Sequence, residues 1–256
     1  MEGEYIRPLK EMDEFYELVI IQRDAWGFDN LDVLPPHIFR DVSNLMGPNG
    51  IVLGYFIDEK LIGYIVTFPT SNPGEVLVDM LAVSPDYRNR GIGYKLCLEL
   101  RTIMLSRNII KIFWTYDPLE SVNANLYIKK LGGVITSHLK DYYGSIDSKI
   151  HSGLPTDRFI VEWNIRSERV EDRIKKRDEK ITRISDDKNT KYVDIPLNIQ
   201  ELKNKDINLA IEWRMRTRKL FDEYVEKQKL IGIDFIHDKI NQKGIYIFGK
   251  DTDCTV

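Results

Sequence analysis

Short apolar runs separated by turn residues fill the first part of the chain, and their spacing predicts alternating strands and helices. Residues 5–8 fit a short strand, and residues 13–26 and 36–46 repeat apolar side chains at helical intervals before a glycine ends each run. Residues 50–58 and 61–68 are strand-like runs joined by a tight polar turn, which predicts a β-hairpin. This part is therefore expected to be ordered β, α, α, β, β.

The middle of the chain continues the alternation up to residue 165. A strand is expected at 76–83, a helix follows a Ser-Pro-Asp break, and a second helix ends at a pair of glycines. The first of these helices covers about 92–104 and is followed by a strand at 109–116. The second passes through Leu126 and Ile128, and strands at 134–139 and 158–165 complete the domain. The whole order is β, α, α, β, β, β, α, β, α, β, β, which indicates a mixed α/β domain.

The composition changes near residue 166, where a charged segment with only scattered apolar residues begins. We therefore expect a main domain at 1–165, a charged linker or exposed helix at 166–192, and a small, mainly helical C-terminal extension at 193–256. The extension contains an amphipathic helix that needs a partner surface. The apolar side chains expected on its buried face are Leu209, Ile211, Trp213, Leu220, Phe221 and Tyr224.

Bulk properties exclude several classes of protein. Lys and Arg total 37 against 40 Asp and Glu, so the net charge of −3 gives no basic excess for binding nucleic acid. The polar N-terminus does not resemble a signal peptide, and no apolar run is long enough to span a membrane. Cys97 and Cys254 match no metal or redox spacing. A cytoplasmic protein with no membrane or nucleic-acid partner is expected.

One turn has the composition of an anion site. Arg88-Asn89-Arg90-Gly91-Ile92-Gly93 lies between the predicted strand at 76–83 and the helix that follows. Backbone amides at a helix start have no partner within the helix, and the helix dipole adds positive charge there. The glycines allow a diphosphate to approach those amides, while the arginines add charge. A purely structural glycine turn is the alternative, and the spacing is not the dinucleotide-binding fingerprint.

Two motifs resemble signatures of the GNAT acetyltransferase superfamily. Residues 80–93, Met-Leu-Ala-Val-Ser-Pro-Asp-Tyr-Arg-Asn-Arg-Gly-Ile-Gly, resemble its fourth strand running into the coenzyme-binding helix, and residues 123–133 resemble its second signature. The resemblance covers roughly residues 3–165 and implies the GNAT acyl-CoA N-acyltransferase fold, with a mixed, mostly antiparallel central sheet flanked by helices. Residues 113–119, 153–158 and 212–218 look like a branch of the superfamily with a C-terminal extension.

The resemblance implies a site for acyl-CoA as co-substrate. The pantetheine arm would pair with the main chain of the fourth strand, and the pyrophosphate would bind the amides of the turn. The residues implied for coenzyme binding are Leu81, Ala82, Val83, Arg88, Asn89, Arg90, Gly91, Ile92, Gly93, Tyr94 and Asn123.

Direct acyl transfer needs a neutral amine and benefits from a proton donor near the departing thiolate. By resemblance Tyr127 is the acid; the alternative is an aromatic that only packs on the sheet. Asp79, a charge inside an apolar strand, can act as a base, orient an ammonium group, or make a structural hydrogen bond. Asp117 and Glu162 are weaker candidates for the base.

Four arginines can either bind a carboxylate group of the acyl donor or acceptor or form ordinary ion pairs within the protein. They are Arg158, Arg214, Arg216 and Arg218. The spacing of the four histidines indicates neither a metal site nor a Ser-His-Asp triad. They are His37, His138, His151 and His237.

The sequence thus predicts an acyl-CoA-dependent N-acyltransferase that acts on a small amine or amino acid by direct attack in a ternary complex. The C-terminal extension is expected to cover the acceptor or to form a homodimer. The alternative from another class is a non-catalytic domain that binds acyl-CoA as a sensor or scaffold, and a nucleic-acid-binding protein is disfavoured by the charge balance.

Overall fold

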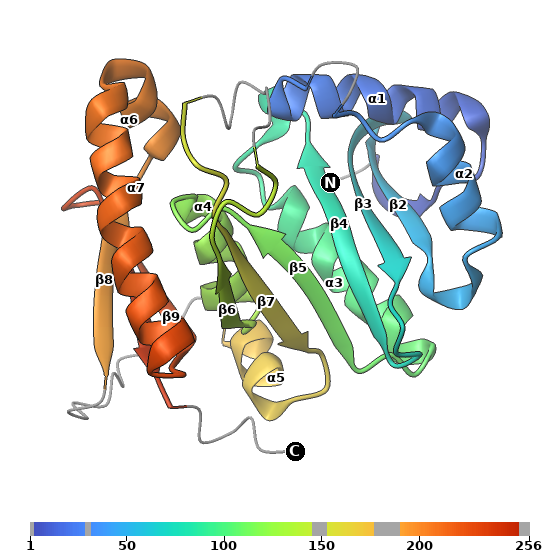
Figure 1. Cartoon of the computed structure of the whole chain (residues 1–256). Helices are drawn as coiled ribbons and strands as arrows, with labels where there is room; N and C mark the ends of the chain where they lie inside the picture. The colour runs from blue at the N-terminus through green and yellow to red at the C-terminus, as the bar shows by residue number, and fades with distance from the viewer. Residues whose placement is uncertain (1–2, 29–31, 145–152, 177–189, 251–256) are drawn as a thin grey trace. The chain divides into compact units, whose positions relative to one another are not determined.

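The computed structural model describes residues 3–28, 32–144, 153–176 and 190–250, and divides the chain into two compact units (Figure 1). The first unit comprises Met1–Trp114 with Asp147–Ser152, and the second comprises Thr115–Ile146 with Gly153–Val256. The units divide the chain at residue 114, whereas composition places a domain boundary at residue 165. Each unit is described by itself.

The first unit is built on a sheet in the order β1-β2-β3-β4-β5. Neighbouring strands are antiparallel from β1 to β4, and β5 is parallel to β4. The strands are β1 (Glu4–Pro8), β2 (Ile51–Ile57), β3 (Lys60–Pro69), β4 (Glu75–Val83) and β5 (Lys111–Tyr116), the last of which continues past the boundary between the units.

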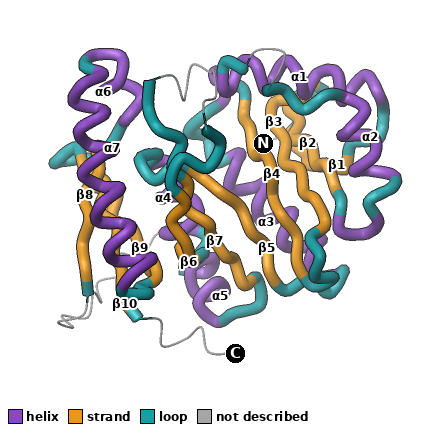
Figure 2. The backbone as a smooth tube through the Cα atoms, in the orientation of Figure 1, coloured by secondary structure: helices purple, strands orange, loops and turns teal. Residues whose placement is uncertain are grey.

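Helices cover both faces of this sheet (Figure 2). Helices α1 (Met12–Trp26) and α2 (Pro36–Asn44) bury their apolar side chains with Phe56 on one face. The neighbouring Tyr55 points to the other face, where it bonds Lys95 of α3 (Ile92–Ser106) at 3.0 Å. Short 3₁₀ turns, η1 (Gly47–Asn49) and η2 (Pro85–Tyr87), complete the unit. Both helical layers follow the apolar periodicity of the sequence.

The second unit holds an antiparallel arrangement in the order β7-β6-β9-β10-β8. Its strands are β6 (Val134–Leu139), β7 (Arg158–Asn164), β8 (Lys191–Pro196), β9 (Ile231–Asp238) and β10 (Lys243–Gly249). Its helices are α4 (Ser121–Ala124) with its π-helical continuation η3 (Asn125–Lys130), α5 (Glu168–Lys175), α6 (Ile199–Lys205), and α7 (Ile207–Phe221) with its π-helical continuation η4 (Asp222–Lys227).

The order of elements predicted up to residue 165 is confirmed, as is a mixed α/β fold with a mostly antiparallel sheet. Helix α5 occupies the first part of the predicted linker and packs inward through Val170 and Arg173, whose guanidinium pairs with Asp234 at 2.9 Å. The extension has the expected helices and also three strands, β8, β9 and β10, which the apolar pattern did not predict. None of the helices in the described part of the chain is both long and apolar enough to cross a membrane.

The buried face of α7 differs from the prediction. The residues it buries are Ala210, Arg214, Thr217 and Phe221, whereas Leu209 is 38% exposed. The prediction is confirmed at Phe221 and wrong at Leu209, because two polar side chains lie on the buried face and Arg214 is buried with a carboxylate partner in Asp117. Hydrophobic periodicity cannot detect a charge that is buried as an ion pair.

Candidate active site

The turn predicted to bind pyrophosphate leads into the N-terminus of α3. Asn89 and Gly91 have φ angles of 63° and 79°, in the left-handed region where glycine and asparagine are favoured. No side chain caps the helix, and the amide of Lys95 is the first to bond back, to the carbonyl of Gly91 at 3.0 Å. An added Cβ at Gly91 meets nothing within 4 Å. The start of α3 is therefore an uncapped helix terminus beside open space, which suits an anion.

The two arginines of the turn have different surroundings. Arg88 donates from Nε to the carbonyl of Val83 at 3.2 Å and from Nη2 to the carbonyl of Ala25 at 2.9 Å. Its guanidinium thus ties the end of β4 to the end of α1. Arg90 is exposed, donates to the carbonyl of Asp86 at 3.1 Å, and lies 5.0 Å from the ring centre of Tyr87. Both side chains are exposed, but the guanidinium of Arg88 bonds the ends of two elements, whereas that of Arg90 bonds within the turn itself.

Strand β4 offers an unpaired edge immediately before the turn. It pairs with β5 only through Glu75–Leu77, which lie opposite Lys111–Phe113. From Val78 to Val83, no described strand pairs with that edge, so the main chain of Leu81, Ala82 and Val83 lies along it. A free strand edge can accept an extended ligand through main-chain hydrogen bonds.

Asp79 lies at a bulge in this strand. Val66 of β3 is opposite Met80 and Thr67 is opposite Val78, so Asp79 has no residue opposite it. Its side chain is exposed, and among the described residues its carboxylate makes no hydrogen bond or ion pair. Nearby protein still removes part of its hydration, and this desolvation raises the pKa of Asp79 above the ordinary value for Asp. A carboxylate with a raised pKa is a better proton acceptor than an ordinary one.

Asn123 and Tyr127 lie in the second unit, on the helix that follows β5. Asn123 is half-buried on α4, and Tyr127 is half-buried on the π-helical segment η3. The ring of Tyr127 makes an edge-to-face contact with Tyr116, with ring centres 5.6 Å apart. Such π-helical insertions within α-helices occur frequently at functional sites.

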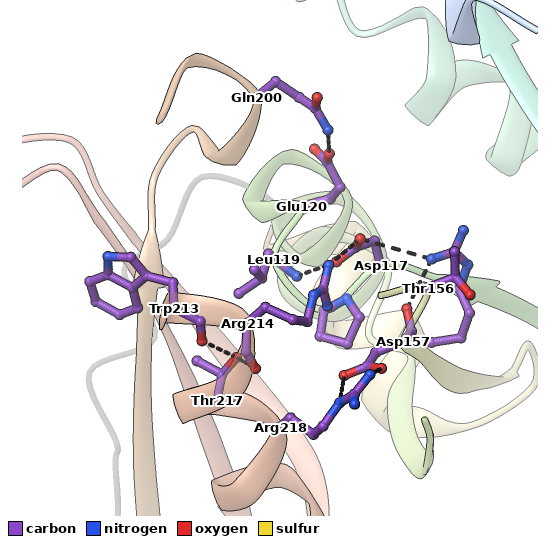
Figure 3. A network of polar contacts seen from close by, with 12 residues as sticks. Asp117, Leu119, Glu120, Thr156, Asp157, Gln200, Trp213, Arg214, Thr217 and Arg218 are labelled. Atoms are coloured by element: carbon purple, nitrogen blue, oxygen red, sulfur yellow. Dashed lines mark hydrogen bonds and ion pairs between the residues drawn. The ribbon is translucent and has the colours of Figure 1, made fainter. Parts of the chain in front are cut away.

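The arginines considered for a carboxylate clamp are engaged with side chains of the second unit (Figure 3). Arg214 pairs with Asp117, and Arg218 binds both carboxylate oxygens of Asp157, from Nε at 2.9 Å and from Nη2. Arg158 donates from Nη1 to the main-chain carbonyl of Asp157 at 2.9 Å. Arg216 pairs with Asp194 and lies over the ring of Trp213. Ion pairing is therefore the interpretation that the structure supports for this group.

The weaker candidates have other surroundings. Asp117, at the end of β5, is the partner of Arg214, and Glu162 is half-buried on β7. His138 is buried, with Nε2 3.6 Å from Oδ2 of Asp157, while His37 is exposed and His151 lies outside the described residues. Burial tends to raise the pKa of Asp157, but the nearby imidazole of His138 and the hydrogen bonds from Arg218 outweigh it and hold the pKa below its ordinary value. In the described ranges, no group of His, Cys, Asp and Glu side chains is placed to hold a metal ion.

Sequence analysis missed the polar residues that surround the end of β5. Asp157, Tyr246 and Gln200 have contacts there with residues between 61 and 130 positions away in the chain. Periodicity and motif spacing contain no signal for such distant partners. The only sequence feature that could have indicated them is the presence of polar residues within otherwise apolar segments.

Known proteins are similar to this chain in part of its sequence and in its fold. The family model described as "Acetyltransferase (GNAT) family" matches residues 13–132. The fold is similar to that of the ribosomal-protein-S18-alanine N-acetyltransferase from Escherichia coli, with 18% identity over 63% of this chain and 94% of that chain and a TM-score of 0.52. No curated protein matches the chain.

Two further solved structures have the same fold. A putative GNAT acetyltransferase from Desulfovibrio desulfuricans is 14% identical over 64% of this chain and 99% of that chain, with a TM-score of 0.51. A GNAT acetyltransferase from Streptococcus pneumoniae is 22% identical over 62% of this chain and 98% of that chain, with a TM-score of 0.50. The family model covers residues 13–132, which is less than half of the chain, and the solved structures show that the chain has the fold of GNAT acetyltransferases.

Proposed function

We propose that the protein transfers an acyl group, acetyl in the simplest case, from acyl-CoA to the amine of a small molecule by direct attack in a ternary complex. The observation that carries this proposal is the uncapped start of α3 at Gly91, directly after a β4 edge that no described strand pairs with from Val78 to Val83. Both features lie in the first unit and together suit a ligand with an extended arm and a diphosphate.

In this proposal the main chain of the coenzyme site does most of the binding. The amides from Asn89 to Tyr94 hold the pyrophosphate, and Leu81, Ala82 and Val83 pair with the pantetheine arm through their backbone groups. Arg90 adds charge at the surface of the turn. Arg88 stabilises the backbone that leads into the turn, because its guanidinium already donates to the carbonyl oxygens of Val83 and Ala25.

The chemistry uses Tyr127, which the resemblance implies as the acid, and Asp79, which stands out in the sequence as a charge inside an apolar strand. Asp79 accepts a proton from the acceptor amine, directly or through water, and the neutral nitrogen attacks the thioester carbonyl. A carbon–nitrogen bond forms, the carbon–sulfur bond breaks, and the thiolate of CoA takes a proton from the phenol of Tyr127. The proton that the nitrogen loses on becoming an amide passes through solvent and restores the phenol. The raised pKa of Asp79 and its lack of a partner among the described side chains support its role as the base. Asn123 contacts the pantetheine in this proposal.

The acceptor is proposed to be a small amine or an amino acid. The E. coli structure with a similar fold acts, by its description, on an alanine of ribosomal protein S18. A peptide with an N-terminal alanine is therefore the informative competitor for the small acceptors.

A release assay tests the proposal. The full chain is incubated with acetyl-CoA or succinyl-CoA and with amines, amino acids or an N-terminal alanine peptide, and free CoA thiol is followed with a thiol reagent. We expect thiol release above the acceptor-free rate with at least one small acceptor, at about 1 per second or faster, as is usual for enzymes. Release with the peptide alone contradicts a small acceptor, and tight acetyl-CoA binding without release supports a sensor.

The same assay includes Asp79→Asn. We expect this variant to bind acetyl-CoA as the wild type does and to lose about 100-fold in turnover, since a general base contributes about 10²–10⁴-fold. Because the pKa of Asp79 is raised in the folded state, its charge destabilises the fold as pH rises through that pKa. Asp79→Asn should therefore be at least as stable as the wild type at neutral pH, and a loss of both stability and CoA binding would contradict a role restricted to the base.

A further inference from the structure

The short connection from Tyr116 to Ser121 joins β5 to the helix that carries Asn123 and Tyr127. The described part of the C-terminal extension, residues 193–250, contacts this connection along almost its whole length. Both belong to the second unit. The family match ends at residue 132, so the extension lies outside it.

The carboxylate of Asp117 links the extension to the turn. Its Oδ1 accepts from the amide of Leu119 at 2.8 Å, which fixes the turn into α4. Its Oδ2 accepts from Nη2 of Arg214 on α7, and Nη1 of Arg158 lies 3.9 Å away (Figure 3). Arg214 is only 1% exposed, so its charge is compensated inside the protein. Without Arg214, the carboxylate of Asp117 would keep the longer ion pair with the guanidinium of Arg158, at 3.9 Å.

The hydroxyl of Tyr246 on β10 also makes hydrogen-bond contacts with this connection. It donates to the carbonyl of Pro118 at 2.8 Å and lies 3.1 Å from the hydroxyl of Tyr116. Burial raises the pKa of both tyrosines, so both hydroxyls keep their protons. The ring of Tyr116 in turn makes the edge-to-face contact with Tyr127. A continuous chain of contacts thus leads from Tyr246 to Tyr127.

Two more contacts complete the attachment. Nε2 of Gln200 on α6 donates to Oε1 of Glu120 at 2.6 Å, and the hydroxyl of Ser121 donates to the carbonyl of Leu197. The extension therefore contacts residues 116, 117, 118, 120 and 121 of the connection. Because the extension contacts the connection at five residues, the helix that follows, α4 with η3, is expected to be fixed in one position.

From these contacts we propose that Arg214 and Tyr246 are positioning residues for acyl transfer: the extension fixes the connection, and the connection fixes Tyr127. The proposal rests on the proposed function, because it assumes that the position of Tyr127 matters for turnover. It assigns the extension a part in catalysis that is distinct from covering the acceptor or forming a dimer. A misplacement of about 1 Å can cost about 100-fold in rate, so small shifts of the helix are enough.

Tyr246→Phe tests the proposal with little loss of volume. It removes the hydroxyl and both of its contacts while keeping the buried ring. Tyr192→Phe is the matched control, since Tyr192 lies on the neighbouring strand β8 and is 47% exposed. Arg214→Lys is a second variant, with Arg216→Lys on the exposed side of the same helix as its control.

We expect Tyr246→Phe and Arg214→Lys to lower kcat about tenfold, with the Kd for acetyl-CoA unchanged within about twofold, whereas both controls behave like the wild type. The decisive measurement is a double-mutant cycle with Tyr127→Phe. If Tyr246 acts through Tyr127, Tyr246→Phe should lower kcat in the wild-type background and have little further effect once the phenol of Tyr127 is absent. The same factor in both backgrounds would overturn the proposal.

A second readout separates this proposal from the proposed function. In protein labelled with 3-fluorotyrosine, the ¹⁹F resonance that disappears in Tyr127→Phe belongs to Tyr127. Tyr246→Phe should shift or broaden that resonance, and Tyr192→Phe should not. An unmoved resonance in folded Tyr246→Phe overturns the positioning role. A normal kcat in Tyr127→Phe instead contradicts the assignment of Tyr127 as the acid.

Discussion

Replacing Gly91 by Glu is expected to weaken acetyl-CoA binding about 100-fold or more, which corresponds to about 2.7 kcal/mol. The carboxylate would stand beside the amides that are proposed to bind the pyrophosphate, and like charges repel most strongly where water is partly excluded. A side chain fits sterically, because an added Cβ at Gly91 meets nothing within 4 Å. The loss should therefore come from charge and from the blocked approach, and it can be measured by calorimetric titration.

Gly47→Glu is the matched control. Gly47 also lies in the first unit with a φ of 67°, and an added Cβ there also meets nothing within 4 Å. The cost of forcing an L-residue into the left-handed region, about 1 kcal/mol, is thus common to both variants. Equal affinities for acetyl-CoA in the two variants would show that the turn at Gly91 does not hold the coenzyme.

Tyr127→Phe is expected to lower kcat about 100-fold while the Kd for acetyl-CoA remains close to that of the wild type. Only the phenolic oxygen is removed, and the ring that packs against Tyr116 is kept. Loss of a general acid typically costs about 10²–10⁴-fold in rate. The measurement is steady-state thiol release together with a binding titration.

Tyr16→Phe serves as the control for this substitution, since Tyr16 lies on α1 with 59% of its surface exposed. It should leave both kcat and Kd unchanged. A Tyr127→Phe enzyme with wild-type kcat would leave Tyr127 as a packing residue, which is the alternative that the sequence also allows. Weaker acetyl-CoA binding at unchanged kcat would likewise contradict the role of a proton donor.

Local patterns in the sequence predicted the first part of the fold because its elements are encoded locally. Apolar spacing defined α1, α2 and α3, and the glycine at position 91 marked the start of α3. The same local reasoning identified the turn, whose function depends on backbone amides at a helix start. Asp79 stood out as a charge in an apolar strand, but its place at a bulge depends on the register with β3.

The rest of the site depends on contacts between residues that are far apart in the chain. Arg214 and Asp117 are 97 positions apart, and Tyr246 and Pro118 are 128 positions apart. No periodicity relates such pairs, and a buried arginine looks like a solvent-facing one in a helical pattern until its partner is known. This is why the buried face of α7 was assigned to Leu209 and Trp213 instead of Arg214 and Thr217.

Acyl-CoA is proposed to bind the main chain of β4 and the start of α3, and amide hydrogen exchange tests this binding most directly. Saturating acetyl-CoA should slow exchange in residues 79–83 and 89–94, because the amides of these segments that face the ligand would donate to it. Exchange in α2 (Pro36–Asn44) should not change. Tight binding of acetyl-CoA with unchanged exchange in residues 79–83 and 89–94 would contradict the proposal.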